Sequence, residues 1–361
     1  MKQWRVGIIG ATGMVGQRFI GLLHNHPWFR VTALAASARS AGQTYGQAVA
    51  GRWAMPYALP EYARHMTLLD ADQVEAIAAM VDFVFCAVSL DKAATRALEE
   101  RYAQAEVPVL SNNSACRGLP DVPMIIPELN AAHAAVIPAQ RRRLGTRIGF
   151  IAVKPNCSIQ SYVPALTPLK SFGIQAVSAC TYQAVSGAGK TLEGWPEMAD
   201  NVIPYIGGEE EKSEQEPLKI WGILSEDGSA IRSASEPVIS AQCLRVPVSD
   251  GHMAAVSVKF ARRPTREQLL QAWAEMPAAD LPTAPRPFLK YFEENDRPQT
   301  KLDRDLGGGM AVSIGRLRED PLMDWRFVCL SHNTLRGAAG GNLLTAELLC
   351  RDGWIPTEDE R

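Results

Sequence analysis

One cysteine stands in a segment that suits nucleophilic catalysis. Residues 153–163 read VKPNCSIQSYV, with Cys157 near the middle. The apolar run at residues 150–153 predicts a buried strand, and the residues after Cys157 predict the start of a helix. A thiol at such a turn lies near free backbone N–H groups, which lower its pKa and can hold an oxyanion. Most free cysteines are instead small buried hydrophobic residues, so this segment alone leaves both interpretations open.

A second pair of chemically useful residues flanks a predicted turn. Arg245 and His252 lie on either side of an Asp-Gly dipeptide, between two predicted strands at residues 240–248 and 253–260. If these strands form a hairpin, both side chains face one pocket. Histidine has a pKa near neutral pH, as an acid/base group needs, and arginine suits bidentate binding of a carboxylate. A lone histidine is nevertheless more often structural than catalytic.

Other charged residues could bind an anionic substrate. Arg117 follows the predicted strand at residues 107–110, at the strand end where α/β proteins bind ligands, although it could equally be a surface arginine. Residues 208–219 are strongly acidic, GEEEKSEQEPLK, and most of this run is expected to be solvated. Within it, Glu216 and Lys219 are three residues apart and share one face if the run is helical.

The N-terminus predicts a nucleotide-binding unit. A strand at residues 4–9 leads into GATGMVG and then into a helical pattern, so a pyrophosphate could lie against the glycine turn and the helix N-terminus. The GxxGxxG spacing is one residue wider than the usual fingerprint, and a tight turn in any βαβ protein is the alternative. After the second strand, at residues 31–36, Arg39 takes the place of an acidic residue. An arginine flanked by Ser37 and Ser40 favours the 2′-phosphate of NADP, unless Arg39 is only a solvated charge.

The remaining pattern predicts two domains in an α/β protein. Further strands are expected at residues 81–88, 177–185, 311–317 and 325–330, and helices at 90–103, 265–276 and 331–349. We expect a Rossmann-type parallel sheet for the nucleotide domain, and an α+β domain for catalysis and dimerisation. The nucleotide domain is expected to span residues 1–156 plus 335–361, and the catalytic domain residues 157–334.

Composition excludes several classes of protein. The chain has 361 residues, 47% hydrophobic and 21% charged, with a net charge of −2, so no basic field for nucleic acid or membrane is indicated. No apolar run approaches the roughly 20 residues that span a bilayer, and no signal peptide is recognised. The seven scattered cysteines lack a CxxC pair, which favours reduced thiols in the cytoplasm and predicts no metal site.

Taken together, these motifs resemble aspartate-β-semialdehyde dehydrogenase, in its archaeal and fungal branch. The match covers nearly the whole chain and includes GATGMVG, SNNSACR, KPNCS, YQAVSGAGK, EPLK, LRVPVSDGH and HNTLRGAAGG. The resemblance implies NADPH-dependent reductive dephosphorylation of L-aspartyl-4-phosphate to L-aspartate-4-semialdehyde through a cysteine thioester, in the route to lysine, methionine and threonine. It also implies inorganic phosphate as a partner and a homodimer or homotetramer.

The resemblance also implies roles for individual residues. Cys157 would be the nucleophile and His252 the acid/base, with Gln183 beside the cysteine. Arg245 would hold the α-carboxylate and Glu216 the α-amino group, and Lys219 and Arg117 would bind the phosphate, with Asn156 as a further substrate contact. The implied cofactor contacts are Gly10, Thr12, Gly13, Met14, Val15, Ser37, Arg39, Ser40, Ser89, Ser186, Gly187 and Asn333.

Three alternatives stay open. A related reductase of an acyl-CoA thioester, for example malonyl-CoA, would use the same Cys157 and His252 but would need a groove for CoA. N-acetyl-glutamyl-phosphate reductase is a more distant relative. A non-catalytic NADP-binding sensor would not need the set of Cys157, His252 and Arg245.

Overall fold

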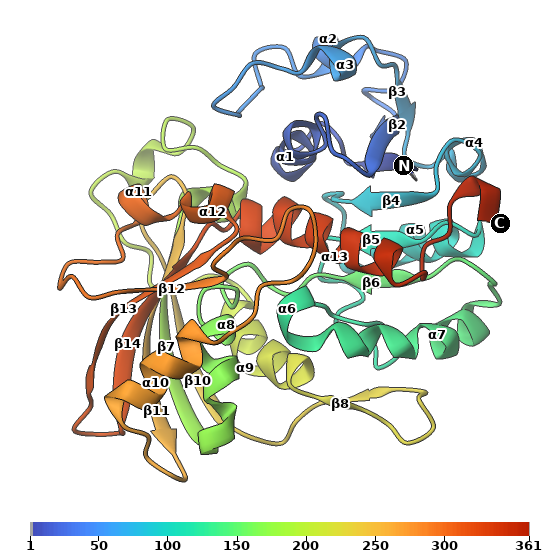
Figure 1. The fold of residues 1–361 in the computed structure, drawn as a ribbon. Helices are drawn as coiled ribbons and strands as arrows, with labels where there is room; N and C mark the ends of the chain where they lie inside the picture. Colours follow the sequence, from blue (N-terminus) through green and yellow to red (C-terminus); the bar gives the residue numbers. More distant parts are fainter. Residues whose placement is uncertain (1–2, 361) are drawn as a thin grey trace.

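The first half of the chain forms a parallel six-stranded sheet. The computed structural model describes residues 3–360 and orders these strands β3-β2-β1-β4-β5-β6 (Figure 1). All five neighbouring pairs are parallel, as crossover connections through helices require. The strands are β1 (Trp4–Ile9), β2 (Phe29–Ala36), β3 (Leu68–Asp70), β4 (Phe83–Cys86), β5 (Val109–Ser111) and β6 (Ile151–Val153).

Helices cover both faces of this sheet, so its central strands are buried on each side. Helices α4 (Val74–Ala78) and α5 (Lys92–Gln104) contribute to the core on one face. Helix α1 (Met14–Leu22) packs on the other face together with the last long helix, α13 (Gly340–Arg351). Figure 1 shows α13, in red, lying beside the first sheet although it is almost at the end of the sequence.

The second half of the chain forms a mixed six-stranded sheet in the order β10-β7-β11-β14-β13-β12. Its two outer pairs, β10 with β7 and β12 with β13, are parallel, and the inner pairs are antiparallel. The strands are β7 (Ile174–Gln183), β10 (Val238–Arg245), β11 (His252–Phe260), β12 (Leu289–Phe292), β13 (Val312–Glu319) and β14 (Trp325–Ser331).

Within residues 3–360, only one face of the second sheet is covered. Helices α8 (Val163–Leu166), α9 (Glu209–Ile220) and α10 (Arg266–Ala274) bury alternate residues of β7, β11 and β14. The residues between them form the open face, and they are partly or fully exposed: Ser178, Cys180, Tyr182, Met253, Ala255, Ser257 and Val328. An open, largely uncharged sheet face of this kind is a candidate interface.

Shorter elements occupy the connections. They are α2 (Tyr45–Ala48), α3 (Glu61–Arg64), α6 (Pro127–Asn130), η1 (Ala131–Val136), α7 (Ile137–Leu144), η2 (Thr167–Phe172), η3 (Val185–Ala188), η4 (Pro196–Met198), β8 (Ile223–Leu224), β9 (Ile231–Arg232), α11 (Thr300–Asp303), α12 (Leu306–Gly309), the π-helical turn η5 (Leu335–Ala339) and η6 (Glu358–Glu360). Among the described residues, no helix combines the length and apolarity needed to cross a membrane.

The predicted fold class is confirmed, and two local features differ from expectation. Strands β10 and β11 do not form a hairpin, because β7 lies between them and pairs with both. The helix expected after Cys157 begins later than a strand-to-helix turn at the cysteine requires: turns occupy residues 157–162, and the four-residue helix α8 begins at Val163. The thiol therefore does not lie at a helix N-terminus.

Candidate active site

Cys157 and His252 come together between the two sheets. The Cys157 Sγ atom lies 3.5 Å from Nε2 of His252, which begins β11 and is fully buried. The backbone N–H of Ala184 donates to the other ring nitrogen, Nδ1, at 3.0 Å. Because Nδ1 accepts this bond, the neutral ring carries its proton on Nε2, facing the sulfur. His252 is therefore placed to donate a hydrogen bond to the thiolate, or to an oxyanion next to it.

The pKa values of this pair differ from those that the residue types suggest. Burial lowers the pKa of His252 well below its usual range, and the nearby Arg245, His332 and Lys154 lower it further. Burial and these neighbouring cations thus favour the neutral ring, in contrast to the pKa near neutral pH that the residue type alone suggests. Burial also raises the pKa of the Cys157 thiol, as does Glu209. The cations Lys154, Arg117 and Arg245 oppose this rise without cancelling it, so any stabilisation of the thiolate comes from positive charge and not from a helix dipole.

Two glycines let the backbone approach these side chains closely. A methyl group on Gly337, in the π-helical turn η5, would lie 2.9 Å from Cβ of Cys157. A methyl group on Gly187, in η3, would lie 2.8 Å from Nη1 of Arg245 and 3.0 Å from Nε2 of His252. An added methyl group would therefore displace Cβ of Cys157 in the first case and the guanidinium of Arg245 in the second, so both glycines allow the site to close around Cys157.

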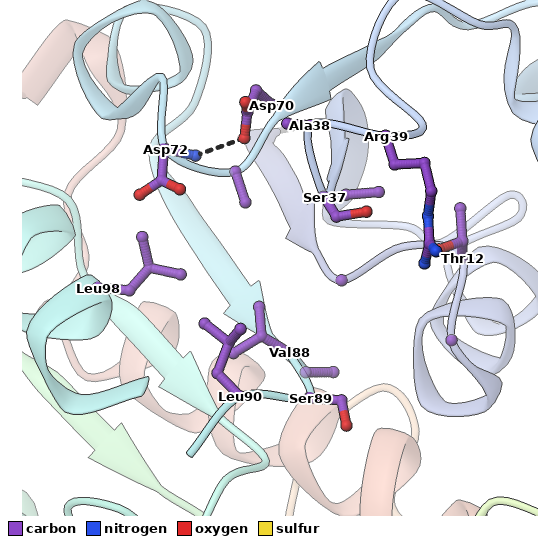
Figure 2. Close-up of a pocket in the computed structure, with 15 residues that line it drawn as sticks. Thr12, Ser37, Ala38, Arg39, Asp70, Asp72, Val88, Ser89, Leu90 and Leu98 are labelled. Atoms are coloured by element: carbon purple, nitrogen blue, oxygen red, sulfur yellow. Dashed lines mark hydrogen bonds between the residues drawn. The ribbon is translucent and has the colours of Figure 1, made fainter. Parts of the chain in front are cut away.

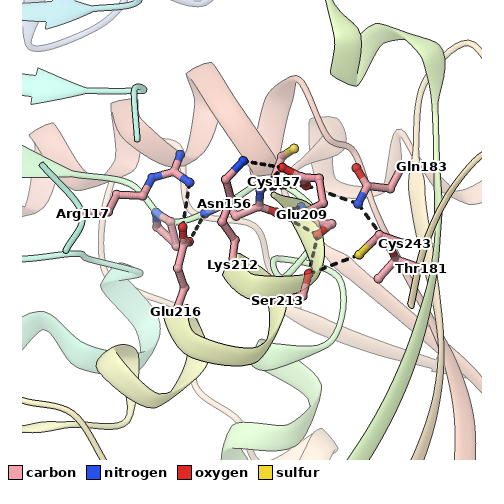
Figure 3. Close-up of polar contacts among 12 residues, drawn as sticks. Arg117, Asn156, Cys157, Thr181, Gln183, Glu209, Lys212, Ser213, Glu216 and Cys243 are labelled. Carbon is pink, nitrogen blue, oxygen red and sulfur yellow. Dashed lines mark hydrogen bonds and ion pairs between the residues drawn. The ribbon is translucent and has the colours of Figure 1, made fainter. Parts of the chain in front are cut away.

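Helix α9 brings a carboxylate and an ammonium to the same place. Glu209, at the start of the helix, accepts hydrogen bonds from Nδ2 of Asn156 (2.9 and 3.0 Å) and from Nε2 of Gln183 (3.3 Å). It also pairs with Lys212 at 2.8 Å. Burial raises the pKa of Glu209, but the contacts with Lys212, Asn156 and Gln183 outweigh it, so the net pKa is lowered. Figure 3 shows Glu209 and Lys212 on the side of α9 that faces Cys157.

The residues predicted on the same helix, Glu216 and Lys219, have structural contacts instead. One oxygen of Glu216 pairs with Arg117 at 2.9 Å, and the other accepts the backbone N–H of Asn156 at 2.6 Å (Figure 3). The ammonium of Lys219 donates to three backbone carbonyls, those of Arg117, Leu119 and Val122, at 2.6–2.9 Å. An ammonium has three donors, so none is left for a phosphate. In this arrangement Glu216 and the ammonium of Lys219 are engaged within the protein, and the assignments of Glu216 to the amino group and Lys219 to the phosphate stay predictions.

A cavity of about 250 Å³ adjoins Cys157. Arg117 reaches it while also donating to the carbonyl of Asn112 at 3.3 Å. The other lining residues are Val15, Asn112, Ser114, Lys154, Asn156, Ser186, Gly187, Glu209, Lys212, Asn333, Thr334, Gly337 and Ala338. Cations from three different elements thus meet beside the sulfur, as an anionic substrate would require.

Asn333 lines this cavity, and Arg245 lies behind its lining residue Gly187. Arg245 is buried, donates from Nη1 to the carbonyl of Ala184 at 2.7 Å, and has its pKa lowered by burial. Asn333 accepts the N–H of Gly251 at 2.8 Å and donates to the hydroxyl of Ser186 at the same distance. The strands of Arg245 and His252 are not neighbours, but both side chains contact the loop at Gly187 and therefore lie near each other.

A second cavity, of about 370 Å³, lies at the carboxyl edge of the first sheet. It is lined by six of the expected cofactor residues: Gly10, Thr12, Gly13, Ser37, Arg39 and Ser89. Gly10 has a φ of +87°, and a methyl group there would lie 2.4 Å from the carbonyl oxygen of Ala87, which explains the need for glycine. Figure 2 shows Arg39 extending toward Thr12, and within residues 3–360 no carboxylate pairs with its exposed guanidinium.

These features fit a dinucleotide whose nicotinamide end reaches Cys157. Val15, Ser186, Gly187 and Asn333 line the cavity at the cysteine and not the one at Arg39. Met14 and Ser40 line neither cavity, and their role as cofactor contacts stays a prediction. Sequence reasoning missed Lys154, Glu209, Lys212 and Gly337. Lys154 directly precedes the segment Pro-Asn-Cys at residues 155–157. Glu209 and Lys212 have the same ExxK spacing as Glu216 and Lys219, seven residues earlier in the sequence.

Comparison with known proteins decides the family. Two family models match, "Semialdehyde dehydrogenase, NAD binding domain" over residues 5–137 and "Semialdehyde dehydrogenase, dimerisation domain" over residues 166–336. The aspartate-semialdehyde dehydrogenase of Archaeoglobus fulgidus is 43% identical over 97% of this chain and 99% of its own length. The chain belongs to the aspartate-semialdehyde dehydrogenase family. The predicted resemblance is therefore confirmed.

Further relatives of this family agree. The Aspergillus fumigatus enzyme of the same name is 42% identical, over 97% of this chain and 98% of its own length. The crystal structure of the Candida albicans aspartate-semialdehyde dehydrogenase with NADP superimposes with a TM-score of 0.87 at 38% identity, covering 98% of this chain and 100% of that one. A Vibrio cholerae aspartate-semialdehyde dehydrogenase II complexed with ASA superimposes with a TM-score of 0.73 at 26% identity, covering 98% and 99%.

Replacing Gly337 with alanine tests the close packing around the nucleophile. The added methyl group would overlap Cβ of Cys157 and displace the thiol. We expect Gly337→Ala to lower kcat by about 10²-fold, the usual cost of misplacing a reacting group by ~1 Å, while cofactor binding is retained. Steady-state kinetics and cofactor titration measure the two effects. Gly207→Ala is the control, because only the hydroxyl of Tyr205, at 3.8 Å, lies near its added methyl group; equal activity of the two variants would contradict the role of Gly337.

Proposed function

We propose that this protein is an NADP-dependent, phosphorylating aspartate-semialdehyde dehydrogenase, which reduces L-aspartyl-4-phosphate to L-aspartate-4-semialdehyde. The pairing of Cys157 with a proton-bearing Nε2 of His252, beside a cavity lined by several cations, is the observation that carries the proposal. The names of the relatives support it over an acyl-CoA reductase or a non-catalytic sensor.

The chemistry requires a soft nucleophile and a place for the leaving phosphate. The Cys157 thiolate forms a bond to the acyl carbon, the bond from that carbon to the phosphate oxygen breaks, and a thioester results. NADPH, when bound, supplies the hydride that reduces this thioester. The C–S bond then breaks as the aldehyde forms, and the thiolate is restored. At both steps Nε2–H of His252 donates to the negative charge that develops on the carbonyl oxygen or on sulfur.

Substrate recognition is divided among several side chains in this proposal. Arg245 binds the α-carboxylate, since a guanidinium matches it with two parallel hydrogen bonds. Glu209, in place of Glu216, binds the α-amino group, with Gln183 and Asn156 fixing the position of its carboxylate. Arg117 and Lys212, in place of Lys219, bind the phosphate, because both line the cavity at Cys157.

We also propose the cofactor preference, the domain division and the assembly. Arg39 and Ser37 suit the 2′-phosphate of NADP, and the Candida albicans relative binds NADP in its crystal structure. The nucleotide domain consists of residues 1–156 plus 335–361, with residues 157–334 as the catalytic domain. The open face of the second sheet would join two copies into a homodimer or a larger homo-oligomer, which agrees with the description of the matching family model as a dimerisation domain. A reduced, cytoplasmic enzyme without nucleic-acid partners stays the expectation.

The reaction class is tested by the acceptor that the thioester needs in the reverse direction. With aspartate semialdehyde and NADP present, we expect steady NADPH formation only when inorganic phosphate is added, measured as absorbance of NADPH. CoA in place of phosphate should give none. Cys157→Ser should abolish turnover and keep cofactor binding. Steady NADPH formation without phosphate, or with CoA, would show that the reaction class is wrong.

The cofactor assignment is tested by Arg39→Ala. The variant loses one charge-assisted contact with the 2′-phosphate, so NADP binding should weaken by about 1.5–3 kcal/mol, or roughly 10- to 150-fold. NAD lacks this phosphate, and its binding should hardly change. Titration of both cofactors into both proteins measures the difference. Equal losses for NADP and NAD would contradict the assignment.

The revised roles on α9 are tested by comparing Lys212→Met with Lys219→Met. Lys219→Met leaves three buried carbonyls without a donor, so we expect a loss of about 3 kcal/mol or more in the free energy of unfolding. Lys212 is partly exposed, and its loss should cost less than about 1 kcal/mol. Lys212→Met should instead raise the KM for phosphate by at least about tenfold, by loss of one charge-assisted contact. Urea unfolding and phosphate kinetics give the two readouts, and a reversed pattern would restore Lys219 as the phosphate ligand.

A further inference from the structure

Lys154 is a buried lysine to which the proposed mechanism gives no contact with the substrate. It directly follows the last residue of β6 and precedes Cys157 by three residues. Its backbone N–H donates to the carbonyl of Ser111 at 3.1 Å. The residue is only 3% exposed, and its ammonium donates to the carbonyl of Pro155. Within residues 3–360 no carboxylate forms an ion pair with it. An ammonium has three N–H donors, so two remain for another acceptor, and a buried cation without a counterion is costly.

The surroundings of Lys154 offer further unused polar atoms. Lys154 lines the cavity at Cys157 together with Asn112, Ser114 and Arg117. Both polar side-chain atoms of Asn112 and the Nε atom of Arg117 are buried without a hydrogen-bond partner among the described residues. Such groups are rare in folded proteins unless a ligand or water satisfies them. Two cations and an amide with unused hydrogen-bonding capacity therefore line one cavity beside the sulfur.

We propose that Lys154 is a further substrate-binding residue, which with Arg117 and Asn112 binds the phosphate group that Cys157 displaces. This inference rests on the proposed function. The phosphorus of an acyl phosphate is one oxygen atom away from the carbon that the sulfur attacks, so its binding site must adjoin Cys157. Lys154 approaches that position from the buried end of β6, whereas Lys212 approaches from α9 and is partly exposed. Charge that develops on the leaving phosphate is stabilised by both.

The electrostatic setting gives this role a pH dependence. Burial lowers the pKa of Lys154 to about 7, and Arg117 lowers it as well, against the opposing effects of Cys157, Glu216 and Glu209. His252 on β11 also faces this group but is neutral, and Lys212 on α9 is paired with Glu209. The ammonium is thus present below about pH 7 and is lost above it. Binding of a dianion should weaken as the pH rises through this value.

Phosphate kinetics test the contact itself. In the direction of NADPH formation, Lys154→Met should raise the KM for phosphate by about 10- to 100-fold, the effect of one charge-assisted contact, and should change the KM for the aldehyde by less than about threefold. Lys154→Arg keeps the positive charge and should restore most of the phosphate affinity. Lys92→Met removes an exposed lysine at the start of α5, away from this cavity and from the open sheet face, and serves as the matched control.

Sulfate binding tests the ionisation without relying on activity. Sulfate remains a dianion across neutral pH, so its dissociation constant reports only the ionisation of the protein. In a Cys157→Ser background, which removes the thiolate, calorimetry should show the sulfate Kd of the Lys154 protein rising up to tenfold per unit above about pH 7. With Lys154→Arg the Kd should stay level over the same range, and with Lys154→Met it should be high and level.

The outcomes separate this inference from the proposed function. An unchanged phosphate KM in Lys154→Met, or a sulfate profile that Lys154→Arg leaves unaltered, would overturn the role of Lys154. If the methionine variant does not fold, the arginine variant still decides through its sulfate profile. If the unmodified enzyme forms NADPH without phosphate, the proposed function fails, whereas the sulfate titration still shows whether Lys154 belongs to an anion site.

Discussion

The site depends on two carboxylates of one helix that hold the turn before the nucleophile. Glu216 accepts the backbone N–H of Asn156, and Glu209 accepts its side-chain amide. The two residues are seven apart, or two turns of α9, and therefore lie on the same face. Through Glu216 the helix also holds Arg117, and through Glu209 it holds Gln183 and Lys212. The position of Cys157 relative to its cations is thus set by how α9 is packed, and not by the local turn at the cysteine.

This dependence explains which parts of the site the sequence could predict. Strand β1 and the glycine turn after it follow from local periodicity, whereas the pairing of Cys157 with His252 was expected only from the family resemblance. The ExxK spacing, by contrast, occurs twice on one face of α9, and periodicity cannot tell which pair faces the cavity. Tertiary contacts determine which pair faces the cavity. Glu216 forms an ion pair with Arg117, and Lys219 donates hydrogen bonds to backbone carbonyls of the loop that contains Arg117. The hairpin prediction was wrong for a similar reason, since a turn signal between β10 and β11 does not exclude the insertion of β7.

Burial changes the chemistry that the residue types alone suggest. An isolated histidine titrates near neutral pH, but His252 is fully buried and close to Arg245 and Lys154, and its pKa falls well below that range. The bond from Ala184 further fixes its tautomer. In the proposed mechanism such a ring is a hydrogen-bond donor to sulfur and then to oxygen. The positive charge near the sulfur comes instead from Lys154, Arg117 and Arg245. These residues are far apart in the sequence, so no local motif predicts that they lie together.

The segment that crosses from β14 to α13 couples the two sheets at the nucleophile. Asn333 connects Gly251 to Ser186, and Gly337 contacts Cys157, before α13 packs on the first sheet. The π-helical turn carries this segment past the cysteine, with the N–H of Gly337 bonded to the carbonyl of His332 five residues earlier. Since α13 is anchored in the core of the nucleotide-binding sheet, a shift of that sheet relative to the second one must move Gly337 against Cys157. The distance between the cofactor cavity and the thiol is therefore fixed by the core packing of the last helix, far from either in sequence.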